Sequence, residues 1–307
     1  MGISFSSAAL QKGVMPTLVR EQAARPLFYV PRLCEIVVSD GQTEVHEQLD
    51  EVPSPETWTG SRKVRALTGR KQTVTNEVRD GSFRIQRDHL RWNRSGSYIR
   101  KMRQLMARTA AFHDTQIASL ITGGESGVYN DDAATDDYFF DDTHAVHGLG
   151  ATYDNLLAGA GTSVANIQSD LAADVLPYFG SVKDGAGELF HTGNLRLIIV
   201  CPRALEMAMR DAVESPLVSS STNVYLGIAE VYADGRLDAT DVNDWYCFVD
   251  DPTARPFIFQ IESDWEEDYI GADSELYVNE RQVQVGVSGC FGYDYLYPQS
   301  ACKVVNT

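Results

Sequence analysis

The sequence predicts an α+β fold, in which a basic β-rich segment and one long helix precede a half of the chain that mixes strands and helices. Three observations predict it. Residues 62–92 alternate in the manner of strands, residues 98–122 repeat apolar side chains at helical spacing, and residues 161–305 alternate short apolar strands with amphipathic helices. With 307 residues, 43% of them hydrophobic and 22% charged, the chain can bury a large core.

Charge is distributed unevenly along the chain, whose net charge is −17. Residues 58–108 hold 14 Lys and Arg against three acids, a net charge of +11, and the rest of the chain, with 12 basic and 40 acidic residues, carries −28. The overall charge argues against nucleic-acid binding over the whole surface. The asymmetry predicts that the basic part of one copy meets an acidic part of another.

The N-terminal part is predicted to be an arm followed by a basic hairpin. Prolines punctuate residues 1–57, so we expect an arm with little core of its own. Residues 58–97 are expected to form a β-hairpin that turns at Asp80–Gly81 and carries Phe83 and Ile85 on one face. So polar a ribbon is marginal alone and should lie on a neighbouring copy. The cations expected at that interface are Arg62, Lys63, Arg65, Arg70, Lys71, Arg79, Arg84 and Arg87.

The long helix is predicted over residues 98–122, with Ser97 as its cap and Gly123–Gly124 as its end. At 1.5 Å per residue it would be roughly 39 Å long. After it, the sequence predicts helices at 164–180 and 203–215, and strands at 195–202, 224–237, 244–251 and 256–262, with two more within 281–305.

One stretch suggests metal chemistry, the segment YFFDDTHAVHG at 138–148. The nearby candidate ligands are Asp131, Asp132, Asp136, Asp137, Asp141, Asp142, His144 and His147. Their spacing matches no calcium loop, and two histidines without a third nearby ligand are a weak zinc signal. We therefore expect an acidic loop that runs into a strand, without a metal ion.

Other candidate motifs are also weak. Gly286–Cys290 approaches a nucleophile elbow but has Cys at its fifth position and lies in a strand pattern. The five cysteines form no C-x-x-C pair and are expected to be thiols, most of them buried. The sequence therefore predicts no catalytic constellation and no cofactor.

Four segments, in this order, resemble a known family. They are WTGSRKVRAL (58–67), YFFDDTHAVHG (138–148), EVYADGRLDATDVNDWYCFVDDPTARPFIF (230–259) and QVGVSGCFGYDY (284–295). Together with the order of hairpin, long helix and α/β part, the chain resembles the HK97-like fold of tailed-phage major capsid proteins. More narrowly, it is similar to the major head subunit family of Mu-like phages over roughly residues 25–305.

The resemblance implies a non-enzymatic shell protein of the virion, made in the cytoplasm of a bacterial host. Hexamers and pentamers of the chain would enclose double-stranded DNA, with no membrane involved. Expected partners are other copies, a separate scaffolding protein, a portal protein and a decoration or minor capsid protein. The implied parts are an N-terminal arm (1–57), an extended loop (58–97), a peripheral domain (98–160) with its spine helix (98–122), an axial domain (161–262) and returning peripheral strands (263–307).

Two alternatives stay open at this point. An encapsulin-like compartment would share the fold and house an enzyme cargo. A nucleic-acid-binding protein would instead use the basic residues 58–108, with Trp58, Trp92 and Tyr98 as stacking groups.

Overall fold

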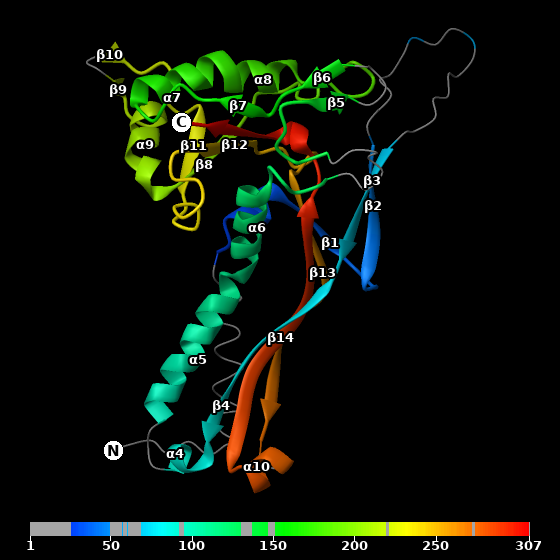
Figure 1. Ribbon diagram of the computed structural model, residues 1–307, viewed down its shortest axis with the longest axis vertical. Coiled ribbons are helices and arrows are strands. Elements are labelled where there is room, and N and C mark those ends of the chain that lie inside the picture. The colour runs from blue at the N-terminus through cyan, green and yellow to red at the C-terminus, as the bar shows by residue number, and fades with distance from the viewer. Residues whose placement is uncertain are drawn as a thin grey trace.

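The computed structural model describes residues 26–49, 57, 60, 69–91, 95–129, 137–146, 151–218, 221–271 and 274–306. They form a broad lobe and a long narrow lobe that extends from it (Figure 1). A five-stranded sheet organises the broad lobe, and a four-stranded sheet with a long helix organises the narrow one.

The narrow lobe is built on a sheet of order β1-β13-β14-β4. Its strands are β1 (Cys34–Val38), β4 (Glu77–Gln86), β13 (Phe257–Ile270) and β14 (Gln282–Tyr295). β1 pairs in parallel with β13, and the other neighbours are antiparallel. Because β1 pairs only as far as Ile261, the outer half of β13 is an edge strand among the residues that the structure describes.

The predicted long helix exists as two helices, α5 (Ser95–Ala110) and α6 (Phe112–Gly123), which meet at Ala111. The Ala111 N–H still donates to the Ala107 carbonyl at 3.3 Å, so the helical bonds continue through the junction. α6 ends at Gly123, as predicted. The buried residues between α5 and the sheet are Met102, Met106, Ile85, Val283, Val285 and Val287. Burial of such side chains contributes about 1.5–3 kcal/mol each.

The hairpin turn predicted at Asp80–Gly81 is wrong. Both residues lie within β4, where Asp80 pairs with Ser288 and Gly81 with Val287 of β14. The ladder with β14 continues through both positions, and this tertiary pairing overrides the local turn preference. Phe83 and Ile85 do face α5, as predicted.

The hairpin that does form pairs β2 (Thr43–Leu49) with β3 (Gly69–Thr75), so residues 50–68 connect its strands.

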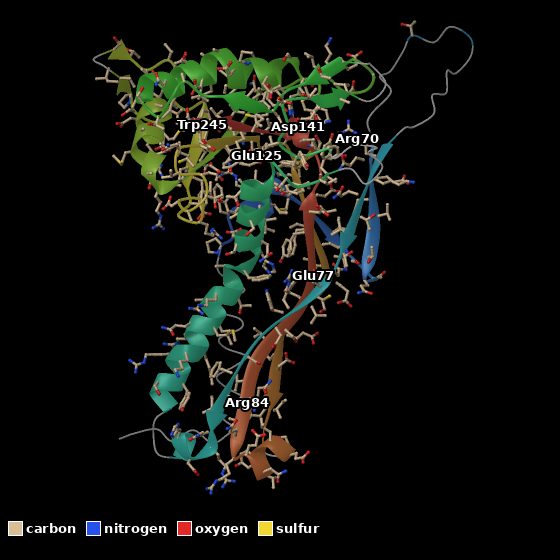
Figure 2. The ribbon with its side chains drawn as sticks, in the orientation of Figure 1. Arg70, Glu77, Arg84, Glu125, Asp141 and Trp245 are labelled. Atoms are coloured by element: carbon tan, nitrogen blue, oxygen red, sulfur yellow. The ribbon has the colours of Figure 1, made fainter. Side chains whose placement is uncertain are left out.

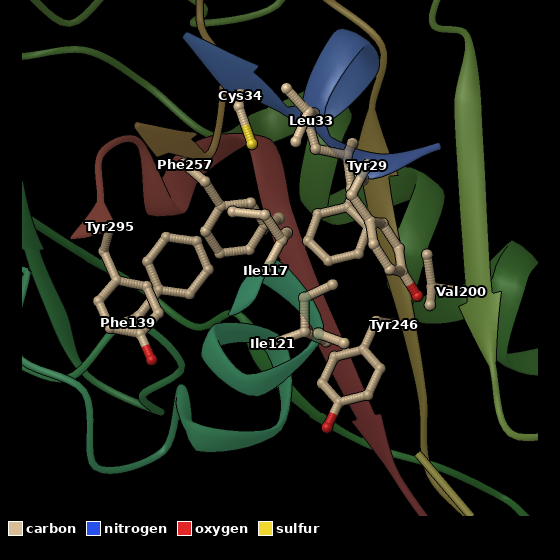
Figure 3. Packing of buried hydrophobic residues seen from close by; sticks show 14 of the residues in the cluster. Tyr29, Leu33, Cys34, Ile117, Ile121, Phe139, Val200, Tyr246, Phe257 and Tyr295 are labelled. Carbon is tan, nitrogen blue, oxygen red and sulfur yellow. The ribbon is translucent and has the colours of Figure 1, made fainter. Parts of the chain in front are cut away.

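Part of the predicted N-terminal arm belongs to the main core, which corrects the expectation of little core there. α3 (Tyr29–Leu33) leads into β1, and Tyr29 and Leu33 are fully buried against Ile117 and Ile121 of α6 (Figure 3). The Asp114 carboxylate accepts bonds from the backbone N–H groups of residues 28 and 29 at 2.9 and 3.1 Å. Residues 1–25 lie outside the described part.

The broad lobe has a sheet of order β11-β8-β12-β15-β7. Its strands are β7 (Leu156–Ala158), β8 (Leu197–Cys201), β11 (Ala229–Ala233), β12 (Trp245–Val249) and β15 (Ala301–Val305). The covering helices are α7 (Val164–Asp170), α8 (Leu176–Ser181) and α9 (Glu206–Val213), with a π-helical turn (Leu171–Val175) between the first two. One face packs on these helices and the other on α6, which explains why β8 and β12 are buried throughout.

Two predicted boundaries therefore shift. β15 was expected among the returning peripheral strands, but it pairs between β12 and β7 in the broad lobe. β13 starts before the expected boundary at 262 and belongs wholly to the narrow lobe. The strand predicted over 224–237 forms only at 229–233.

The other predicted helices and strands are present, and five cysteines are free, four of them buried. The short elements are α4 (Arg87–Arg91), β5 (His144–Val146), β6 (Ala151–Tyr153), a 3-10 turn (Arg203–Leu205), β9 (Leu217–Val218), β10 (Ser221–Thr222), α10 (Glu275–Asn279) and a 3-10 turn (Pro298–Ser300).

Candidate subunit interface

The β2–β3 hairpin has one face on the body and one face in solvent. Along β3 the side chains alternate between exposed and buried, and Gln72 and Asn76 are buried with Val74. Gln72 Nε2 donates to the Val128 carbonyl at 3.3 Å, and His46 Nε2 bonds Gln260 Oε1 at 2.8 Å. These polar contacts fix the base of the hairpin to the narrow lobe.

Arg70 is a residue of the fold and not of an exposed interface, which corrects its place in the predicted set. It is 4% exposed, its guanidinium lies over the Tyr129 ring and bonds the Tyr129 hydroxyl, and Nη2 donates to the Ala145 carbonyl at 3.0 Å (Figure 2). Arg70 lies two residues before Gln72 and four before Val74, so the alternation of side chains along β3 places all three on the inner face. Sequence alone could not tell which face of the hairpin that would be.

Lys71 points the other way and is exposed, directly opposite Glu47 on β2. Its neighbours on this outer face are Thr43, Val45, Thr73 and Thr75, all exposed. Of the predicted interface cations on the hairpin, Lys71 is thus the one that the described residues leave accessible to a partner. Arg62, Lys63 and Arg65 lie outside the described residues.

The three predicted cations in and just after β4 contact their own chain. Arg79 pairs with Glu77 and lies over the Phe112 ring, and Arg84 Nη1 lies 3.2 Å from Glu280 Oε2 (Figure 2). The guanidinium of Arg87 lies over Tyr277. Exposed pairs of this kind stabilise by only about 0–1 kcal/mol, so a partner could displace them at little cost.

A second basic surface lies on α5 and is absent from the predicted set. Arg100, Lys101, Arg103 and Arg108 are exposed, and none of them forms an ion pair with a residue that the structure describes. No acid occurs between Asp88 and Asp114 in the sequence. The signal that could have identified this surface is that 25-residue gap together with the helical spacing of its cations.

The outer half of β13 is the acidic counterpart. Glu262, Asp264, Glu266 and Glu267 are exposed, and Asp268 is half-buried. Among the described residues none of the five has an ion-pair partner. Partial burial raises the pKa of Glu267 above its usual value. No described strand pairs with the edge beside them, because the pairing with β1 ends at Ile261.

The acid and histidine segment is part of the core. Phe139 and Phe140 are buried, and His144 Nε2 donates to Asn155 Oδ1 at 3.0 Å. The Asn155 amide also donates to the Phe139 carbonyl at 2.9 Å and accepts from the Asp141 N–H at 2.9 Å. Burial lowers the pKa of His144 to about 4, so its ring is neutral at pH 7. These contacts give the segment a structural role.

Two other chemical candidates can be placed. Gly286–Cys290 lies inside β14, where Ser288 pairs with Asp80, so the residues form a strand as predicted. Within the described residues, no group of three or more His, Cys, Asp or Glu is placed to hold a metal ion. His147, Asp131, Asp132 and Asp136 lie outside that part.

No described helix is long and apolar enough to span a membrane.

Comparison with known proteins gives one family and a set of similar structures. Residues 20–180 match the family model described as Mu-like prophage major head subunit gpT. The chain is similar to a solved chain of the bacteriophage JBD30 procapsid, with 13% identity, 99% of this chain and 77% of that chain covered, and a TM-score of 0.58. It is also similar to a chain of the cyanophage P-SCSP1u capsid, with 12% identity, 93% of this chain and 91% of that chain covered, and a TM-score of 0.56. For the mature capsid of bacteriophage PhiM1 the identity is 11%, 92% of this chain and 88% of that chain are covered, and the TM-score is 0.56.

At these identities the structural likeness shows the fold alone, which is the HK97-like fold. No curated protein sequence matches the chain.

Proposed function

The chain belongs to the family of the Mu-like prophage major head subunit gpT and is a structural major capsid protein of an icosahedral shell; from this premise we propose how its copies meet. The shell consists of hexamers and pentamers that enclose phage double-stranded DNA. The basic extended loop of each subunit docks on an acidic surface of its neighbour. The chain acts as a building block and not as an enzyme, without metal or cofactor. It is made in the cytoplasm of the bacterial host and ends in the virion.

The observation that carries the docking proposal is the hairpin β2–β3. Its inner face is held to the body by buried polar contacts, its outer face is exposed, and the residues that join its strands include Arg62, Lys63 and Arg65. Apart from residues 58–108 the chain carries −28, so a neighbouring copy offers the opposite charge. Such complementarity sets the orientation of docking and weakens as salt screens it.

Further partners are proposed on family membership. A separate scaffolding protein would guide assembly, a portal protein would occupy one vertex, and a decoration or minor capsid protein would bind the finished shell. Neither an encapsulin-like compartment nor a dedicated nucleic-acid-binding protein is favoured by the family match.

The test is charge reversal of the loop cations that are not buried in the fold. Arg62, Lys63, Arg65 and Lys71 change to Glu, while Arg70 stays because its guanidinium is buried. We expect no shells in negative-stain micrographs and a circular dichroism spectrum like that of the wild type. Changing the same four residues to Gln separates loss of attraction from repulsion and should give an intermediate particle yield. Normal particles from the Glu variant would refute docking through the loop.

A further inference from the structure

The narrow lobe carries opposite charges on two sides, and neither set has an ion-pair partner among the described residues. α5 runs along one side, and β13 lies beyond β4 and β14 on the other (Figure 1). The α5 side presents four exposed cations, and the β13 side five acids, of which four are exposed and Asp268 is half-buried. On neither side do these charges form an ion pair with a described residue. The surface is therefore complementary to a second copy of itself.

The cations of α5 all lie on the exposed half of the helix. Met102, Leu105 and Met106 pack toward the sheet, whereas Arg103 and Gln104 are exposed. Arg100 and Arg103, and likewise Lys101 and Arg108, are three and seven positions apart, which places each pair on the same side of the helix. From Arg100 to Arg108 the surface is about 12 Å long at 1.5 Å per residue. A short β-strand segment can lie along a surface of this length.

The acids of β13 lie on a segment of that kind. From Glu262 to Asp268 the strand extends about 20 Å at 3.3 Å per residue. No basic residue interrupts it, and its outer edge has no strand partner in the described part beyond Ile261. Charges on an open edge prevent pairing with arbitrary strands. A segment whose charged residues are all acidic selects a basic partner.

We propose that the basic side of α5 in one subunit docks on the acidic outer half of β13 in the next. The contact is distinct from the loop contact and uses residues that the loop proposal leaves aside, although it rests on the same shell assembly. It joins unlike surfaces of identical chains, and such head-to-tail contacts close into rings when the rotation permits. Subunits around a hexamer or pentamer have that relation.

Charge complementarity between the two surfaces identifies the molecule that binds them as a second copy of the chain. Duplex DNA would also attract the α5 cations. It would leave the β13 acids without a partner, however, whereas a second copy satisfies both sides at once. The observations therefore favour a neighbouring subunit.

The test is a charge swap, carried out where the other head proteins are present. One variant carries Arg100→Glu and Arg103→Glu, and a second carries Glu262→Lys and Glu266→Lys. We expect each variant to lower the yield of sedimenting particles at least about tenfold, and their combination to restore it to within about twofold, because the attraction is re-formed with its sign exchanged. The matched control for the α5 variant is Lys183→Glu with Arg196→Glu, which changes the net charge by the same amount on exposed positions outside the surface.

Three outcomes would overturn the inference. If the α5 variant assembles like the control while the loop variant still fails, the loop docks but this contact does not exist. If the α5 variant forms full-sized shells that no longer retain DNA, its cations bind the duplex. If the β13 changes rescue the loop variant and not the α5 variant, the acidic edge receives the loop.

Discussion

Lys303 offers the sharpest test of what joins the two lobes. Its side chain is 3% exposed, and the ammonium lies 3.0 Å from Asp241 Oδ1 and 3.2 Å from Asp244 Oδ2. The ammonium also pairs with Glu125, which follows the end of α6. Tyr246 donates a hydrogen bond to Asp241 at 2.6 Å. The strand β15, the loop before β12 and the end of α6 thus share a single buried cation.

The perturbation is Lys303→Met, which keeps the length and apolar stem of the side chain and removes the charge. Asp241 is 8% exposed and would then be a buried carboxylate without its counter-ion. Removing one member of a buried pair costs about 3–5 kcal/mol. Because Glu125 is half exposed and can turn to water, the lower end applies, about 3 kcal/mol. For a chain of this size that lowers Tm by roughly 5–10 °C.

The pKa of Lys303 determines how its contribution to the stability of the fold depends on pH. Burial alone would lower it, but the bonds to Glu125 and Asp241 outweigh burial and leave the pKa above its ordinary value. A raised folded pKa means that the stabilisation is complete below the unfolded value near 10.5 and is lost as the pH rises through the folded value. The difference between wild type and variant should therefore be full at pH 7 and shrink in strong alkali.

The assay is urea denaturation of the purified subunit at pH 7, with Lys183→Met as control because that lysine is exposed. The double variant Lys303→Met with Asp241→Asn should recover part of the loss, since it removes the orphaned charge. If Lys303→Met unfolds at the same urea concentration as the control, the buried cation does not hold the lobes together, and the reasoning fails.

Three further predictions concern the fold. Asn155→Ala should cost about 2–3 kcal/mol of unfolding free energy, because its buried amide bonds three backbone groups of two separate segments. A loss below about 0.5 kcal/mol in urea denaturation would contradict this. Gly286→Ala should cost about 1–3 kcal/mol, since its new β-carbon would lie 2.6 Å from a side-chain carbon of β4, whereas Gly180→Ala meets open space and should be neutral or stabilising. Burial lowers the pKa of His113 and His144 to about 4, so stability should fall between pH 6.5 and 4, by up to about 3 kcal/mol per histidine; an unchanged urea midpoint across that range would refute it.

Local sequence patterns determined much of this fold. The apolar spacing over 98–122 predicted the long helix to within a few residues, and the apolar run at 195–202 predicted β8. These signals are local. Helical periodicity and a continuous apolar run show which side chains are buried, but they do not show which other residues cover them. The charge asymmetry predicted a self-complementary surface for the same reason, since charge is a property of the residues themselves.

Tertiary pairing decided the rest. The turn preference of Asp80–Gly81 is a local effect of about 1 kcal/mol, and a ten-residue ladder with β14 outweighs it. The burial of Arg70, the place of β15 and the open edge of β13 depend on partners more than 50 residues away in sequence. Period-two alternation does not show which face of a strand packs against the rest of the protein, or where its partner strand ends. The sequence therefore determined that a basic and an acidic surface exist, and only the three-dimensional structure decided which residues compose them.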